Sequence, residues 1–242
     1  MGKKRSWLAG LMAVLGTVAL YRGRLRQWIY TWGADDGEIT AVLPGDELVA
    51  ADTPRTTRAL TIDAPAAMVW PWLAQIGEGR GGFYSYDWLE RAAGTEIRNA
   101  DVIHPEWQDI RVGDTVWLAR RYGEAARQVV AAVKPLSHLV LMSPDDYERV
   151  QRGEKASGAW SFHVRPQSGW TRLVVRGSGG AVGHAVFDIP HFVMEQKMMR
   201  GIRHRAEQTR RDDTAAFVRE EYLTIQHEQP AAQRGQNISL VR

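Results

Sequence analysis

The sequence contains no cysteine, which excludes disulfide bonds, thiolate nucleophiles and cysteine-ligated metals and leaves the redox compartment open. It has no basic run interleaved with aromatic residues in a nucleic-acid reader motif, so we expect no nucleic-acid partner. His104 and Glu106 have H-x-E spacing, but no second histidine pair accompanies them. These absences lead us to expect neither a metal nor a cofactor.

The glycine-rich stretch at residues 77–82 lacks the Lys-Ser/Thr pair of a phosphate-binding P-loop. It also follows a predicted helix rather than a strand. Glycine is needed where the chain turns tightly, because it adopts backbone dihedrals that other residues avoid. We interpret the stretch as a tight connection between two helices.

The composition is that of an ordinary globular protein. Its 242 residues are 44% hydrophobic and 24% charged, with a net charge of +3. This length accommodates one large domain with a sizeable core. Ten tryptophans indicate wide apolar surfaces, either in the core or around a ligand.

The N-terminal segment, residues 1–31, has the pattern of a membrane anchor or amphipathic helix. Trp7 to Tyr21 carries no charge and follows Lys3, Lys4 and Arg5. As a helix it would extend about 22 Å, short of a hydrocarbon core of about 30 Å. No small-x-small cleavage site follows. We favour a single uncleaved anchor on an undetermined side of the membrane; a removed signal peptide and a buried helix of a cytoplasmic protein stay open.

The middle of the chain predicts one strand, two helices and a run of antiparallel strands. Trp160, Phe162 and Val164 alternate with polar residues, which is typical of a half-buried strand. On that pattern His163 is expected to face solvent. The polar stretch Asp145–Ala156 is predicted to be an inserted loop without an assigned role. The elements expected are strands at 57–63, 115–118, 128–133, 139–142, 160–165 and 171–176, and helices from Pro65 to Ile76 and from Phe83 to near Gly94.

A long amphipathic helix is predicted from Asp188 to Arg211, with Pro190 near its start. On a helical wheel its apolar residues fill an arc of roughly 160°: Phe192, Met194, Met198, Met199, Ile202 and Ala206. Glu195 lies near the middle of that arc. Residues 212–242 turn polar and predict a disordered tail, apart from a short helix around Phe217.

The order of these elements predicts an α+β helix-grip fold. A curved antiparallel sheet with one apolar face needs a cover, and the long helix can lie across it. We therefore expect residues 32–211 to form one domain, with a cavity between the sheet and the C-terminal helix.

Several motifs resemble those of the START-like (SRPBCC) superfamily of polyketide cyclase/dehydrase-type proteins, and more narrowly a bacterial subgroup of it. They are L-P-G-D at 43–46, T-I-D-A-P at 61–65, V-W-P-W-L at 69–73, G-R-G-G-F-Y-S-Y-D-W-L-E at 79–90, N-A-D at 99–101, V-G-D at 112–114 and F-V-M-E-x-K-M at 192–198. The resemblance spans about residues 32–211. It implies the helix-grip fold and either ligand binding or cyclisation chemistry, without selecting one activity.

The predicted function is binding, transport or sequestration of a hydrophobic or lipid-like small molecule. Methionines and aromatic rings suit an apolar ligand of irregular shape. The residues expected to line its site are Trp72, Phe83, Tyr84, Tyr86, Trp88, Trp160, Phe162, Met194, Glu195, Met198, Met199 and Ile202.

Glu195 is the principal candidate for a specific role, and three interpretations stay open. It forms an ion pair with an arginine such as Arg80, Arg172 or Arg205; it contacts a polar group of the ligand; or, with a pKa raised by burial, it acts as the general acid-base of a cyclase- or dehydrase-like enzyme. A further alternative is a membrane-surface interaction protein without a ligand, which would use the basic outer face of the long helix.

Overall fold

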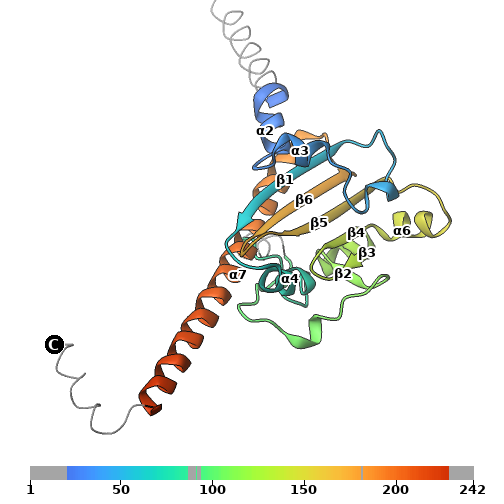
Figure 1. Ribbon diagram of the computed structural model, residues 1–242. Coiled ribbons are helices and arrows are strands. Elements are labelled where there is room, and N and C mark those ends of the chain that lie inside the picture. Colours follow the sequence, from blue (N-terminus) through green and yellow to red (C-terminus); the bar gives the residue numbers. More distant parts are fainter. Residues whose placement is uncertain (1–20, 87–90, 92–93, 181, 229–242) are drawn as a thin grey trace, which may run out of the picture.

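The computed structural model describes residues 21–86, 91, 94–180 and 182–228, and its centre is an antiparallel sheet (Figure 1). Six strands lie in the order β1-β6-β5-β4-β3-β2. Their bounds are β1 Arg55–Ile62, β2 Thr115–Trp117, β3 Arg127–Lys134, β4 His138–Met142, β5 Gly158–Pro166 and β6 Thr171–Gly179. The predicted strands are thus present, with ends that differ by a few residues.

The register of β1, β6 and β5 determines which side chains share a face of the sheet. Phe162 pairs with Val175, and Val175 pairs with Arg58. Because side chains alternate between faces, Arg58 lies on the same face as Leu60 and Ile62 of β1. We call this the inner face, because it carries the core cluster that includes Leu60, Ile62, Phe162 and Val175.

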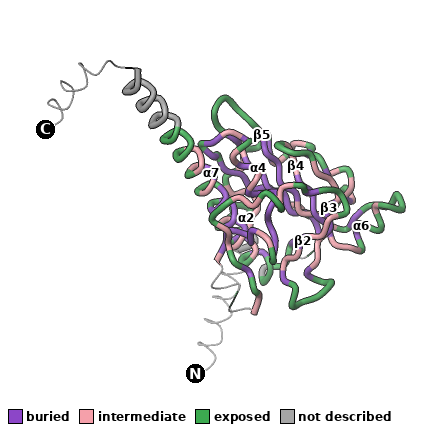
Figure 2. Tube along the Cα trace, turned by 90° about the horizontal axis from the view of Figure 1, so that it is seen from below, coloured by how far each residue is buried: buried purple, intermediate pink, exposed green. Residues whose placement is uncertain are grey.

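Helix α7, Ala185–Glu228, crosses the inner face and confirms the predicted helix-grip arrangement. Met198, Met199, Ile202 and Ala206 are all buried in the same core cluster. Helix α4, Ala66–Ala74, packs against α7 on the same side. In Figure 2 the buried segments concentrate in the sheet and in the helix turns that face it.

Gly201 allows α7 to approach the chain segment around Tyr84 very closely. A Cβ at this position would lie 2.2 Å from the carbonyl oxygen of Tyr84. Tyr84 itself has a left-handed backbone (φ 56°), which is unusual for a bulky residue. Its N–H donates to Asn99 and its hydroxyl to the carbonyl of Trp72, so the surrounding residues hold it in place.

The opposite, outer face of the sheet is covered by the chain between α2, Arg26–Tyr30, and β1. This region contains α3, Asp36–Thr40, and the short 3-10 helix η2, Asp46–Leu48. Arg176 of β6 is buried beneath it and donates to the carbonyls of Glu38, Ile39 and Ala41 and to Asp46. The outer face is therefore not the solvent face that simple alternation predicts.

Helical structure is found in two segments that were predicted to be a loop and a mostly disordered tail. The segment predicted as an inserted loop forms α6, Pro144–Gln151, because Ser143 accepts a hydrogen bond from the Asp146 N–H and Pro144 occupies the first turn. Helix α7 continues through residues 212–228, predicted to be a mostly disordered tail, and leaves the domain (Figure 1). Those residues contain no proline or glycine, so a helix already formed can propagate through them.

The remaining helices connect or flank the sheet. They are η1 Tyr21–Leu25, α2 Arg26–Tyr30, η3 Pro105–Trp107 and η4 Arg120–Ala126. Residues 77–82 form the predicted tight connection, with Gly77, Gly79 and Gly82 at positive φ. The helix predicted after it, at 83–94, does not begin at Phe83, because residues 83–86 are not helical. Residues 87–90 and 92–93 of that prediction lie outside the described residues.

Helix α2 packs onto the domain although it belongs to the predicted N-terminal segment. Trp28 contacts Phe192 edge-on, and Arg58 donates to the carbonyl of Ile29 at 2.8 Å. Within the part of the chain that is described, no helix is both long enough and apolar enough to cross a membrane. The predicted anchor lies almost entirely in residues 1–20, outside that part.

Candidate ligand-binding cavity

A cavity of about 500 Å³ lies between the inner face of the sheet and the first half of α7. Its lining residues come from β3 and β5, from the residue that follows β2, from the segment after α4, and from α7. They are Phe83, Ser85, Thr95, Ile97, Leu118, Gln128, Trp160, Phe187, His191, Met194, Glu195 and Met198. The cavity predicted between sheet and helix is therefore present.

Aromatic rings form much of the cavity wall. The Trp160 ring lies 6.2 Å from that of Phe83 and 4.7 Å from that of Phe162 in the core behind it. Phe187, which is 40% exposed, stacks on His191 with 5.0 Å between ring centroids. A neighbouring pocket of about 320 Å³ shares Phe187, His191, Trp160 and Gln128 with the cavity. Phe187 and His191 thus lie where the cavity meets the surface.

Glu195 forms the polar part of this wall. Its Oε2 accepts a hydrogen bond from Arg58 Nη1, and its Oε1 accepts one from Trp160 Nε1 at 2.7 Å. Both charged side chains are 1% exposed. The arginine that pairs with Glu195 is therefore Arg58, and not the predicted Arg80, Arg172 or Arg205. Those three instead contact backbone carbonyls, Glu38 and Asp101 respectively.

The surroundings of Glu195 lower its pKa, whereas the acid-base interpretation requires a raised one. Burial raises the pKa of this carboxyl, but the charges of Arg58 and His191 and the hydrogen bonds from Arg58 and Trp160 outweigh that effect. Glu195 is thus an ionised carboxylate with both oxygens partnered. It is poorly suited to carry a proton at neutral pH.

His191 lines the cavity one helical turn before Glu195, although it is not among the predicted lining residues. Its Nδ1 lies 3.4 Å from Arg58 Nη1, and its Nε2 lies 3.9 Å from Glu195 Oε1. Burial lowers the pKa of His191, and the nearby Arg58 charge lowers it further against the opposing effects of Glu195 and Asp188. Its i,i+4 spacing to Glu195 was the signal that could have found it.

The predicted ligand-lining residues divide into two groups. Phe83, Trp160, Met194, Glu195 and Met198 line the cavity. The others that are described lie elsewhere: Trp72, Tyr84, Phe162, Met199 and Ile202 are in the packed core, and Tyr86 contacts Lys197. Trp88 lies outside the described residues.

His163 does not face solvent as the alternation of β5 predicts. It is 3% exposed on the outer face, its Nε2 lies 2.9 Å from Ser161 Oγ, and the chain before β1 covers that face. Burial, reinforced by the charges of His138, Arg176 and Arg165, lowers the pKa of His163 to about 3. It is a neutral core residue remote from the cavity.

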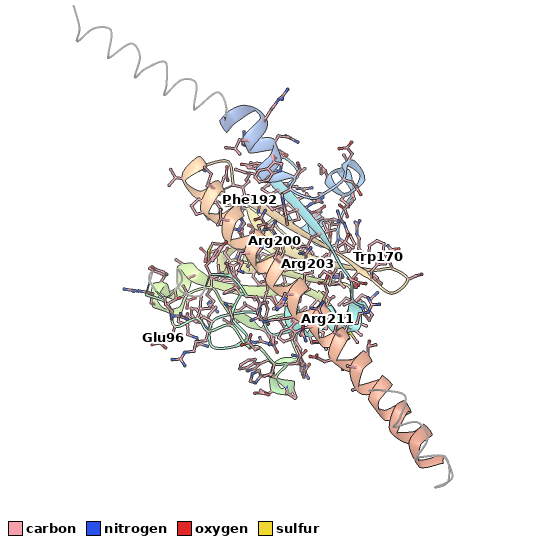
Figure 3. The ribbon with its side chains drawn as sticks, turned by 90° about the vertical axis from the view of Figure 1, so that its left-hand side faces the viewer. Glu96, Trp170, Phe192, Arg200, Arg203 and Arg211 are labelled. Carbon is pink, nitrogen blue, oxygen red and sulfur yellow. The ribbon has the colours of Figure 1, made fainter. Side chains whose placement is uncertain are left out.

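The basic outer face of α7 is largely occupied by contacts within the chain. Lys197 lies over the Tyr86 ring, Arg200 over the Trp32 ring, and Arg210 pairs with Asp63. Figure 3 shows Arg200, Arg203 and Arg211 following one another along the helix.

Among the described residues, no group of three or more histidine, aspartate or glutamate side chains is arranged to hold a metal ion.

Comparison with known proteins gives structural matches only: no family model and no curated protein matches the sequence. Protein MLL2253 from Mesorhizobium loti matches at 14% identity and a TM-score of 0.39, over 64% of this chain and 98% of that one. The Polyketide_cyc-like protein Cgl2372 from Corynebacterium glutamicum matches at 15% identity and a TM-score of 0.27, over 74% and 98%. CalC from Micromonospora echinospora, described as a self-sacrificing resistance protein, matches at 12% and 0.38, over 64% and 93%.

Matches at these identities and TM-scores do not indicate a function. The fold is assigned from the six-stranded sheet and the helix α7 that crosses it. It is a helix-grip fold. That is the architecture implied by the motifs that resemble the START-like superfamily.

Proposed function

We propose that this protein binds a hydrophobic small molecule in the cavity beneath α7. The observation that carries the proposal is the cavity itself, about 500 Å³ in volume and walled mainly by aromatic, methionine and aliphatic side chains. Ligand sites commonly have 300–1,000 Å³, apolar walls and a few polar groups. Methionines such as Met194 and Met198 adapt to ligands of irregular shape.

Binding is favoured over cyclase- or dehydrase-like catalysis by the state of Glu195. A general acid-base must exchange a proton near the working pH. The lowered pKa of Glu195 and its bonds to Arg58 and Trp160 hold it as a carboxylate. Its role in this proposal is to complete the cavity wall as half of a buried ion pair.

A fluorescence titration with N-phenyl-1-naphthylamine tests the proposal. This uncharged apolar fluorophore should bind the wild-type protein at one site. The Leu118→Trp variant, which fills the cavity, should lose most of that binding. Leu136→Trp, at a 46% exposed position outside the cavity, is the matched control and should bind as the wild type does. Equal binding by both variants would place the probe elsewhere and contradict the proposal.

We also propose that the N-terminal segment holds the protein at a membrane, where apolar ligands are plentiful. The uncharged run from Trp7 to Tyr21 motivates this. It is supported by exposed apolar residues on η1 and α2, which follow that run in the sequence, and on the start of α7, which α2 contacts. These residues are Leu25, Trp28, Val186, Ile189 and Val193. Exposed apolar residues of this kind can insert at a membrane interface.

Flotation of the full chain with phosphatidylcholine vesicles tests the membrane proposal. We expect the wild type to float and a Trp28→Ser, Ile189→Ser double variant to float less. Val112→Ser, which removes an exposed apolar side chain far from α2 in the chain, is the control. A wild-type chain that stays at the bottom of the gradient would refute membrane attachment and leave the cavity proposal standing.

A further inference from the structure

The cavity beneath α7 contains a polar atom that has no partner. Thr95 Oγ1 is fully shielded from solvent and forms no hydrogen bond, and Thr95 lines the cavity. A buried hydroxyl without a partner is unfavourable, because it has lost its water without gaining another bond. A ligand group bonded to Thr95 would remove that penalty.

The other polar side chains of the wall each have at least one hydrogen-bond partner. Ser85 Oγ donates to the Met194 carbonyl at 3.0 Å, and Gln128 Nε2 donates to the Arg127 carbonyl at 3.0 Å. Glu195 is occupied by Arg58 and Trp160. Thr95 Oγ1 is therefore the polar atom of these lining residues that is both buried and without any hydrogen-bond partner.

The charge balance of the wall is also complete. Glu195 is the one formally charged residue among the lining residues described, and Arg58 compensates its charge. A ligand carboxylate or ammonium group would enter an apolar cavity without a free countercharge, which is costly. A hydroxyl or carbonyl group would not carry that cost.

We propose that the cavity selects an uncharged, mainly apolar ligand with one hydroxyl or carbonyl group that hydrogen-bonds to Thr95 Oγ1. The threonine hydroxyl can donate to a carbonyl or accept from a hydroxyl, so it suits either group. This inference rests on the proposed binding function and specifies its ligand class. It excludes ionised fatty acids as preferred ligands, although an apolar cavity alone would admit their chains.

Three probes of one ring system separate these possibilities: naphthalene, 2-naphthol and 2-naphthoate, each competing with N-phenyl-1-naphthylamine at pH 7. For the wild type we expect 2-naphthol to bind at least tenfold more tightly than 2-naphthoate. In Thr95→Val, which keeps the side-chain shape, 2-naphthol should weaken about 5- to 10-fold while naphthalene binds equally well or better. Thr95→Ser restores a hydroxyl and should recover much of the 2-naphthol affinity.

The inference is overturned if Thr95→Val changes naphthalene and 2-naphthol by the same factor, or if 2-naphthoate binds as tightly as 2-naphthol. These outcomes leave the binding function intact, since the fluorophore would still bind. If the fluorophore and all three competitors fail to bind the wild type, the proposed function fails first and this inference fails with it.

Discussion

Two arginines on neighbouring strands, Arg58 of β1 and Arg176 of β6, are buried on opposite faces of the same sheet. Each is among the largest fully buried side chains, and each pairs with a carboxylate. Arg176 also bonds to Thr57 and to three backbone carbonyls of the covering segment. Arg58 donates to one backbone carbonyl, that of Ile29, and also contacts Glu195, His191 and the Phe192 ring.

The difference indicates two uses of the same chemistry. Arg176 lies in a closed environment where it satisfies the backbone of a segment that has little regular structure of its own. Arg58 lies behind the wall of a cavity, where its main effect is to neutralise Glu195. We therefore infer that the outer pair stabilises the fold and that, in the proposed binding function, the inner pair sets the charge that the cavity accepts.

Replacing Arg176 should have the largest effect on stability. Arg176→Met removes the buried partner of Asp46, which keeps only the Leu43 N–H and the half-exposed Arg55, and it leaves three carbonyls without this donor. Breaking a buried pair costs about 3–5 kcal/mol. We expect a loss of that size in the free energy of unfolding, measured by urea denaturation. Arg149→Met, at an exposed position on α6, should change it by less than about 0.5 kcal/mol. A loss below about 1 kcal/mol for Arg176→Met would contradict the structural role.

The inner pair should cost less to break. In Glu195→Gln the amide oxygen keeps the bond from Trp160 and Arg58 keeps its bond to the Ile29 carbonyl, so the main loss is the one charge-assisted bond between Arg58 and Glu195. We expect a loss of about 2 kcal/mol in urea denaturation, smaller than for Arg176. The variant should also bind 2-naphthoate more tightly than the wild type, because Arg58 then supplies a free positive charge. Unchanged discrimination against 2-naphthoate would show that Arg58 and Glu195 do not control the charge of the ligand.

Acidification should destabilise the protein through His163, which is buried on the outer face of the sheet. Its pKa is about 3 in the folded protein and about 6.5 when unfolded, so between these values the unfolded chain binds more protons. Stability from this residue is complete above pH 6.5 and falls as pH drops toward 3, by at most about 1.4 kcal/mol per pH unit.

The check is urea denaturation at pH 7, 6, 5 and 4 for the wild type and His163→Asn. The amide side chain cannot become charged, so the variant should lose less stability on acidification. His191→Asn should change the pH dependence less, because His191 is 26% exposed and its charge is more easily hydrated. Parallel curves for the wild type and His163→Asn would refute the assignment.

The sequence predicted the fold well because its apolar patterns are regular. Trp160, Phe162 and Val164 identified β5, and the methionine arc of α7 identified the covering helix. The cavity and five of its lining residues followed from that arrangement. What the patterns could not provide was the identity of partners brought together from distant segments.

The partner of Glu195 illustrates this point. Arg58 shares its strand face with Leu60 and Ile62, so it is a charged residue on an apolar strand face. Glu195 is likewise a charged residue on an apolar helix face. These two charged residues pair with each other. Both were visible in the sequence, but pairing them required knowing how β1 lies against α7. His163 was misplaced for a different reason: alternation identifies a face of the sheet but not what covers it.

Gly201 has a consequence for how a ligand enters. Since the helix backbone touches the chain at Tyr84 with no room for even a methyl group, α7 cannot slide or roll across the sheet without losing that contact. This contact holds the distance between α7 and the sheet, and therefore the depth of the cavity, constant. In the proposed function, a ligand would then enter by the rotation of side chains such as Phe187 at the surface end, and not by movement of α7.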